Sequence, residues 1–119
     1  SEGQTYSVQV GTYTKIGNTV FVQGRIVMSS LGTLSTGDNV RLNGFPFTSS
    51  SISNNFATVC YGQAQGLIIV AGQSLAGYLN PSGVVSTIRV WNQTTGTDGL
   101  LFTQLTASGG FMFSCSYKV

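Results

Sequence analysis

Apolar and polar residues alternate with a period of two along this chain, and this alternation restricts the fold more than any other feature. From Val20 to Met28, one face carries Val, Val, Gly, Ile and Met, and the other carries Phe, Gln, Arg and Val. From Phe111 to Val119, one face carries Phe, Phe, Cys, Tyr and Val, whereas Met, Ser, Ser and Lys occupy the other. Successive side chains of a β-strand point to opposite faces of its sheet. We therefore expect the first face of each segment in the core and the second at the solvent or an edge.

Shorter segments of the same kind predict further strands. They are Thr5–Val10, Asn39–Asn43, Phe56–Tyr61, Gly66–Ala71, Leu75–Leu79, Val85–Trp91 and Leu100–Leu105. Glycine-rich stretches that suit tight turns lie between them, at Ile16–Asn18, Thr36–Asn39, Asn80–Gly83, Thr95–Gly99 and Ser108–Gly110. No segment keeps the apolar spacing of an amphipathic helix. About nine short strands predict an all-β fold, an antiparallel β-sandwich or jelly roll, formed by residues 1–119 as a single domain.

Charged residues are scarce, at 7% of the chain against roughly 25% in a typical domain. The net charge of +2 comes from scattered lysines and arginines, so the sequence has no basic stripe for nucleic acid and no polybasic patch for a membrane surface. The longest apolar run, Leu67–Ala71, is too short for a membrane-inserted segment. Because surface charge normally keeps isolated domains apart, its scarcity indicates an oligomer with a neutral exterior rich in hydroxyl and amide groups.

The sequence lacks the residues on which most enzyme and metal sites depend. It contains no histidine, which excludes the usual zinc sites and the Ser-His and Cys-His nucleophiles. Its carboxylates are Glu2, Asp38 and Asp98, and the two aspartates occupy turn sequences, where this residue bonds to its own backbone. We therefore predict no enzyme activity, no metal and no cofactor. Asp38 and Asp98 lying together in a cleft would reopen the case for a glycosidase.

Cys60 and Cys115 are the only cysteines, and both lie in strand-like apolar segments. We interpret them as two reduced, buried thiols that pack as small hydrophobic residues. The alternative is a disulfide between them.

One predicted strand carries the candidate ligand site. If Ile88 and Val90 point into the core, the alternate residues share the outer face. These are Arg89, Trp91 and Gln93. An indole stacks on the apolar face of a sugar ring, and Arg and Gln side chains bond its hydroxyl or acidic groups, so these residues form a candidate glycan site. The alternative is that Trp91 is a core or interface tryptophan.

The second face of the segment 20–28 carries the candidate subunit interface. Its residues are Phe21, Gln23, Arg25 and Val27. A solvated face that contains Phe and Val would be unusual, so an interface is favoured over a ligand site.

The segment Gly11–Ile26 resembles a recurring sequence near the C-terminus of tailed-bacteriophage tail fibres and tailspikes. Downstream, Val40–Phe47 resembles the Gly-Leu-Pro-Phe element that follows it in those proteins, with Phe45 in place of the leucine. The closing strand Phe111–Val119 also fits. These are scaffold motifs, so the resemblance assigns no ligand-binding residue.

The resemblance implies a β-sandwich that associates as a homotrimer at the distal end of a virion fibre or spike, as a C-terminal fragment of a longer protein. Such domains bind polysaccharide or lipopolysaccharide on the host surface, assist trimerisation, or do both. Two other functions stay open, a purely structural trimerisation or virion decoration module and a lectin-like adhesin domain from a bacterium. An exposed Trp91 beside Arg89 favours binding, whereas a Trp91 buried at a three-fold interface favours the structural module.

Overall fold

The structure is a computed structural model that describes residues 3–33 and 39–119. These residues form the strands β1 (Thr5–Ile16), β2 (Thr19–Ser30), β3 (Arg41–Asn43), β4 (Ala57–Leu67), β5 (Leu75–Leu79), β6 (Val85–Val90), β7 (Asp98–Gly99) and β8 (Leu105–Lys118), and the short 3₁₀ helix η1 (Phe102–Gln104). Every pairing between these strands is antiparallel, which confirms the all-β prediction. In the described part of the chain, no helix is long and apolar enough to cross a membrane.

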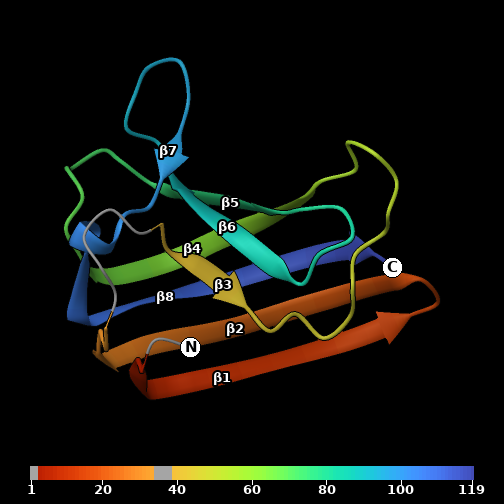
Figure 1. Cartoon of the computed structure of the whole chain (residues 1–119), viewed down its shortest axis with the longest axis horizontal. Helices are drawn as coiled ribbons and strands as arrows, with labels where there is room; N and C mark the ends of the chain where they lie inside the picture. Colours follow the sequence, from red (N-terminus) through yellow and green to blue (C-terminus); the bar gives the residue numbers. More distant parts are fainter. Residues whose placement is uncertain (1–2, 34–38) are drawn as a thin grey trace.

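The strands form one continuous sheet in the order β1-β2-β8-β4-β5-β6-β3, with β7 paired to β6. This sheet is strongly curled into a half-barrel, in which β1, β2, β8 and β4 make one wall and β5, β6 and β3 turn over it (Figure 1). The strand β4 belongs to both walls, because Ala57 and Thr58 pair with β5 whereas the residues from Val59 onward pair with β8. The architecture is therefore one curled sheet, where a sandwich would have two separate sheets.

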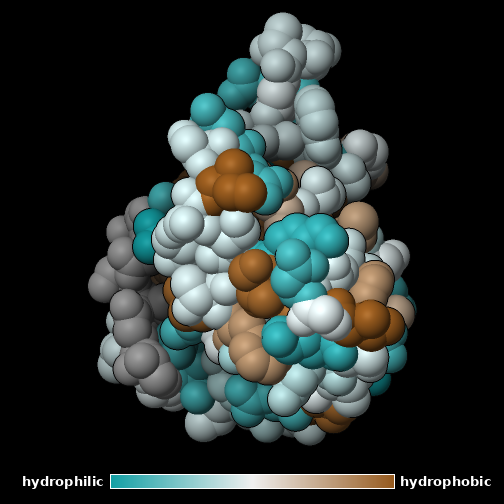
Figure 2. Space-filling model, turned by 90° about the vertical axis from the view of Figure 1, so that its right-hand side faces the viewer, coloured by the Kyte–Doolittle hydropathy of each residue, from teal (hydrophilic) through white to brown (hydrophobic). Residues whose placement is uncertain are grey.

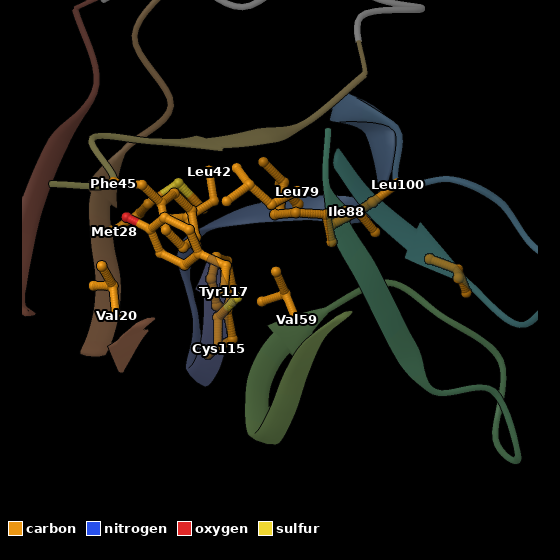
Figure 3. Packing of buried hydrophobic residues seen from close by; sticks show 13 residues of the cluster. Val20, Met28, Leu42, Phe45, Val59, Leu79, Ile88, Leu100, Cys115 and Tyr117 are labelled. Carbon is orange, nitrogen blue, oxygen red and sulfur yellow. The ribbon is translucent and has the colours of Figure 1, made fainter. Parts of the chain in front are cut away.

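The core lies between the two walls of the half-barrel. Side chains from both walls meet in one cluster, including Val20 and Tyr117 from the first wall and Leu79 and Ile88 from the second (Figure 3). Burying an aliphatic side chain of this size stabilises the fold by about 1.5–3 kcal/mol. The Tyr117 hydroxyl also donates to the carbonyl oxygen of Phe47 at 2.9 Å and accepts from its amide at 3.2 Å. These bonds fix the segment after β3 against β8.

The core faces predicted for the two longest alternating segments are confirmed with one exception. Val22 lies opposite Cys115 on the inner face, whereas Gln23 lies opposite Ser114 on the exposed outer face. Val119, predicted on the core face, is exposed because it lies beyond the end of β8.

Two predicted strands and one predicted turn are wrong. Gly66–Ala71 is not a strand, because β4 ends inside it, and Leu100–Leu105 contains an isolated bridge and η1 instead. The predicted turn Ser108–Gly110 lies within β8. Gly66 has a φ of +61°, and a Cβ there would lie 3.0 Å from the Cα of Gly109. These glycines allow an irregular, close approach of β4 and β8 rather than a turn, a distinction that composition does not reveal.

Candidate functional site

The loop between β6 and β7 carries the predicted ligand residues and projects from the body of the molecule at the top of Figure 1. Ile88 and Val90 are fully buried, as the alternation predicted, and Trp91 follows them with 50% of its surface exposed. The Trp91 amide donates to the carbonyl oxygen of Ser74 at 3.0 Å, which fastens the start of the loop to the segment before β5. The backbone of the only tryptophan is therefore anchored while half of the residue stays open to solvent.

Arg89 holds the two ends of this loop together. Its Nη2 atom donates to the carbonyl oxygen of Thr97 at 2.5 Å, and its Nε atom donates to the Oγ1 atom of Thr97 at 3.3 Å. Two nitrogens of the guanidinium group are therefore engaged by the protein. Arg89 is less available to an acidic sugar than its place in the sequence suggests.

Gln93 and Asn92 both turn toward Asp98. The Nε2 atom of Gln93 donates to Oδ2 of Asp98 at 2.7 Å, and the Nδ2 atom of Asn92 donates to the same oxygen at 3.1 Å. These two bonds, together with a smaller effect of the Arg89 charge, lower the pKa of Asp98 below its ordinary value. Sequence reasoning missed this role of Asp98. The available signal was the pair of amide residues five and six positions before an aspartate.

The loop thus presents an exposed indole, a carboxylate and two side-chain amides. Such a set can stack on a sugar ring and hydrogen-bond its hydroxyl groups. The structure brings Arg89, Trp91 and Gln93 into one loop, as expected, but Arg89 and Gln93 also serve the loop's own hydrogen bonds.

A hollow of about 760 Å³ lies on the outer face of the wall formed by β1, β2, β8 and β4. We call it the outer trough. Its lining includes Thr12, Phe21, Gln23, Phe56, Cys60 and Ser114. Hydroxyl, amide, thiol and aromatic groups therefore dominate its surface, and no charged side chain contributes to it within the described residues.

The predicted interface residues lie along this face. Phe21, which is 48% exposed, and Gln23 line the outer trough, and Arg25 lines an adjoining hollow of about 430 Å³. Val27 is only 8% exposed, because Gly110 of β8 approaches it so closely that a Cβ on Gly110 would lie 2.9 Å from Cγ2 of Val27. Val27 therefore has little surface left for a partner.

The strand β1 is the exposed margin of the same wall. Among residues 3–33 and 39–119, it stands at one end of the sheet and pairs on one side with β2 alone. Its exposed side chains include Val10 and Ile16. On its inner side, the Tyr13 ring meets the Phe47 ring edge-to-face at 5.5 Å. A twelve-residue backbone edge is thus open to pairing.

The end of the molecule that carries the C-terminus is mixed in character. Figure 2 faces this end, and its hydrophobic residues form separate patches among polar and neutral ones.

Both cysteines are free thiols. Both cysteines are among the lining residues of the outer trough, but Cys60 is exposed whereas Cys115 is buried. The prediction of reduced thiols is confirmed, but the prediction that both are buried is wrong for Cys60, because the alternation of β4 turns this position outward. Burial, with a smaller contribution from Cys60, raises the pKa of Cys115 to about 11.

Asp98 is the one carboxylate residue of the sequence within the described ranges, since Glu2 and Asp38 lie outside them. Across residues 3–33 and 39–119, no group of three or more His, Cys, Asp or Glu side chains could hold a metal ion.

The fold is similar to part of the crystal structure of Dettilon tailspike protein (gp208), with a TM-score of 0.78 at 13% sequence identity. The similarity covers 98% of this chain but only 21% of the tailspike chain. No protein-family model matches the sequence, and no curated protein matches it. At this identity the similarity concerns the fold alone: the chain resembles a portion of a phage tailspike protein.

Proposed function

We propose that this chain is a domain of a phage tail fibre or tailspike that trimerises and binds polysaccharide or lipopolysaccharide on the host cell surface. It belongs to the virion, lies at the C-terminal end of its parent protein, and acts by binding rather than catalysis. The fold similarity to part of a tailspike supports the virion assignment. The resemblance of Gly11–Ile26 to C-terminal fibre sequences supports the position in the parent protein.

The proposal of receptor binding rests on the exposure of Trp91. This residue is half exposed on a loop whose ends are joined by Arg89 and Thr97. A loop that is ordered before its ligand arrives loses less conformational entropy on binding. Neutral sugars suit this loop best, because Asp98 accepts hydrogen bonds from hydroxyl groups and repels acidic groups, while Arg89 is engaged by Thr97.

The scarcity of charge, the open edge of β1 and the outer trough support the trimerisation half of the proposal. Three copies on one fibre would convert weak contacts at three Trp91 loops into useful avidity.

The test is the binding of the purified domain to an array of bacterial lipopolysaccharides and capsular polysaccharides. The intrinsic fluorescence of Trp91, the only tryptophan, then reports contact at this loop directly. We expect its emission to shift to the blue with the bound polysaccharide, and Trp91→Ala to weaken binding by about tenfold in the trimer. Ile52→Ala is the matched control, because Ile52 is an exposed hydrophobic residue outside the loop. It should bind as the unmodified domain does.

Light scattering on the same preparation gives the oligomeric state. A trimer that binds no polysaccharide would favour the structural module. A monomer that binds one would favour the lectin-like adhesin. A domain that neither trimerises nor binds would overturn the whole proposal.

A further inference from the structure

We propose that the outer trough is the surface on which a second copy of this chain docks. This inference rests on the trimerisation in the proposed function and adds the face that the neighbouring copy covers. The occupant is another copy of the same chain, and a polysaccharide in the trough is the outcome that would contradict it.

The lining of the outer trough has the character of a subunit interface. Phe21 and Phe56 are 48% and 51% exposed, and both face one hollow. The surrounding groups are hydroxyls and amides, without a charged side chain among the described lining residues. The centres of protein interfaces are depleted in charge and enriched in aromatic side chains, whereas two half-exposed phenylalanines in one hollow are unfavourable in water.

The size of the face also fits a second copy. The four strands of this wall are 11 to 14 residues long. With strands about 4.8 Å apart and a rise of about 3.3 Å per residue, their outer face covers about 700 Å². A stable protein interface of standard size buries about 800 Å² on each partner. A copy docked over this whole face, β1 included, would approach this size.

The open edge of β1 borders the outer trough through Thr12, Tyr13 and Thr14. Long free strand edges are normally blocked by charges, prolines or bulges, because they can pair with other chains. β1 has a single lysine and no proline, and its register shifts lie at its start, before Gln9. The part of β1 beside the trough lacks these blocks apart from Lys15. A docked copy would cover trough and edge together.

The symmetry of a trimer decides how the contact is made. In a cyclic trimer each subunit uses two different surfaces, one toward each neighbour. The outer trough of one copy therefore receives a different surface of the next copy, and the contact closes into a ring of three.

Cys60 provides a reporter inside the proposed interface. Both cysteines are lining residues of the trough, but Cys60 is exposed whereas Cys115 is buried. A thiol reagent such as 5,5′-dithiobis(2-nitrobenzoic acid) should therefore react with the folded chain at Cys60 first. The experiment measures this rate over a range of protein concentrations, with light scattering in parallel. The chain unfolded in urea gives the rate of a fully accessible thiol.

We expect a trimer in which Cys60 reacts about tenfold more slowly than in the unfolded chain or a dissociated monomer. Ser114→Arg places a charge at an exposed position in the trough and should yield a monomer with a fast-reacting Cys60. Thr103→Arg, at an exposed position of η1 away from this face, should leave the trimer and the slow rate unchanged.

The outcomes separate the interface from trimerisation itself. A trimer with a fast-reacting Cys60, unaffected by Ser114→Arg, would overturn the proposed face and leave trimerisation standing. A monomer at every concentration would overturn both. Protection of Cys60 by added polysaccharide in a monomer would identify the trough as a ligand site and so contradict the inference. The rate in the unmodified chain decides the question even if Ser114→Arg fails to fold.

Discussion

β6 and β1 belong to one sheet but occupy opposite environments. In β6, Ser86, Ile88 and Val90 are fully buried and the residues between them are half-buried. β1 is twice as long, and all but one of its residues are exposed. The difference follows from position in the curl. β6 lies between β5 and β3 and faces the other wall across the core, whereas β1 ends the sheet.

This contrast separates the part of the molecule that holds the fold together from the part that is available to partners. The β6 side contributes residues without exposed surface, so its substitutions should change stability directly. The β1 side contributes open edge and exposed side chains, so its substitutions should change assembly more than folding.

Ile88→Ala should destabilise the domain by about 3 kcal/mol, because it removes a fully buried side chain and leaves a cavity between the walls. Urea unfolding at one fixed protein concentration measures this loss. Ile16→Ala is the matched change at the exposed end of β1 and should cost less than about 0.5 kcal/mol in the monomer. Equal losses for the two variants would show that β1 is as much a part of the folding core as β6.

Gly24→Ala should destabilise the domain by about 2 kcal/mol, because the added methyl group overpacks the boundary between β1 and the core. A Cβ at Gly24 would lie 2.7 Å from the Phe113 ring and 2.7 Å from the carbonyl oxygen of Val10. Gly11 lies opposite Gly24, and a Cβ there would meet nothing closer than the carbonyl oxygen of Gln23 at 3.9 Å. Gly11→Ala is therefore the control, with little expected change in the midpoint of thermal unfolding. A tolerated Gly24→Ala would mean that β1 moves away from β2 and β8 at little cost.

Local alternation was enough to predict most of the strands, because each strand keeps one face toward the core. Leu75–Leu79 was predicted with its exact ends, and β2 and β8 with their inner faces. β1 was predicted only as far as Val10, because Thr12 and Thr14 interrupt the apolar alternation in its second half. The curl itself depends on β4 changing partner between Thr58 and Val59, which involves residues far apart in the sequence.

The candidate site was predicted in part for a similar reason. Alternation placed Trp91 on the surface, because the buried neighbours Ile88 and Val90 fix its side of the strand. The bonds from Gln93 and Asn92 to Asp98 depend on how the loop folds back, and no periodic pattern records them. The outer trough is formed by four strands from both ends of the chain. The sequence alone therefore indicated only Phe21 and Gln23, which belong to one of these strands.

The buried Tyr117 and the partly buried Tyr61 test this division with single hydroxyl groups. Tyr117→Phe should cost about 1 kcal/mol, because it breaks the bonds to Phe47, whose ring covers the inner side of β1. The Tyr61 hydroxyl lies near that of Ser86, but neither forms a hydrogen bond of good geometry within the described residues. Tyr61→Phe should therefore be neutral or slightly stabilising. Urea unfolding of both variants measures the difference, and a larger loss for Tyr61→Phe would reveal a bond that this geometry does not contain.

The acid titration of Asp98 should have a small effect. It tests whether side-chain hydrogen bonds can keep the exposed Trp91 loop ordered. Its pKa lies below the ordinary value of 3.8, because the carboxylate accepts bonds from Gln93 and Asn92. Such a group supports the folded loop above its ordinary pKa, and this support is lost as the pH falls through the folded-state pKa. We therefore expect the fluorescence emission of Trp91 to stay constant from neutral pH down to about 4 and to change below it.

Asp98→Asn identifies the source of that change, because the sequence contains two other carboxylate residues, Glu2 and Asp38. The asparagine keeps the size of the side chain but removes the titrating carboxylate, so its emission should show no acid step. An identical step in Asp98→Asn would assign the transition to another carboxylate and leave the loop without its proposed fastening. If the unmodified domain itself shows no acid step, backbone pairing of β6 with β7, rather than the carboxylate, fixes the platform on which a sugar is proposed to stack.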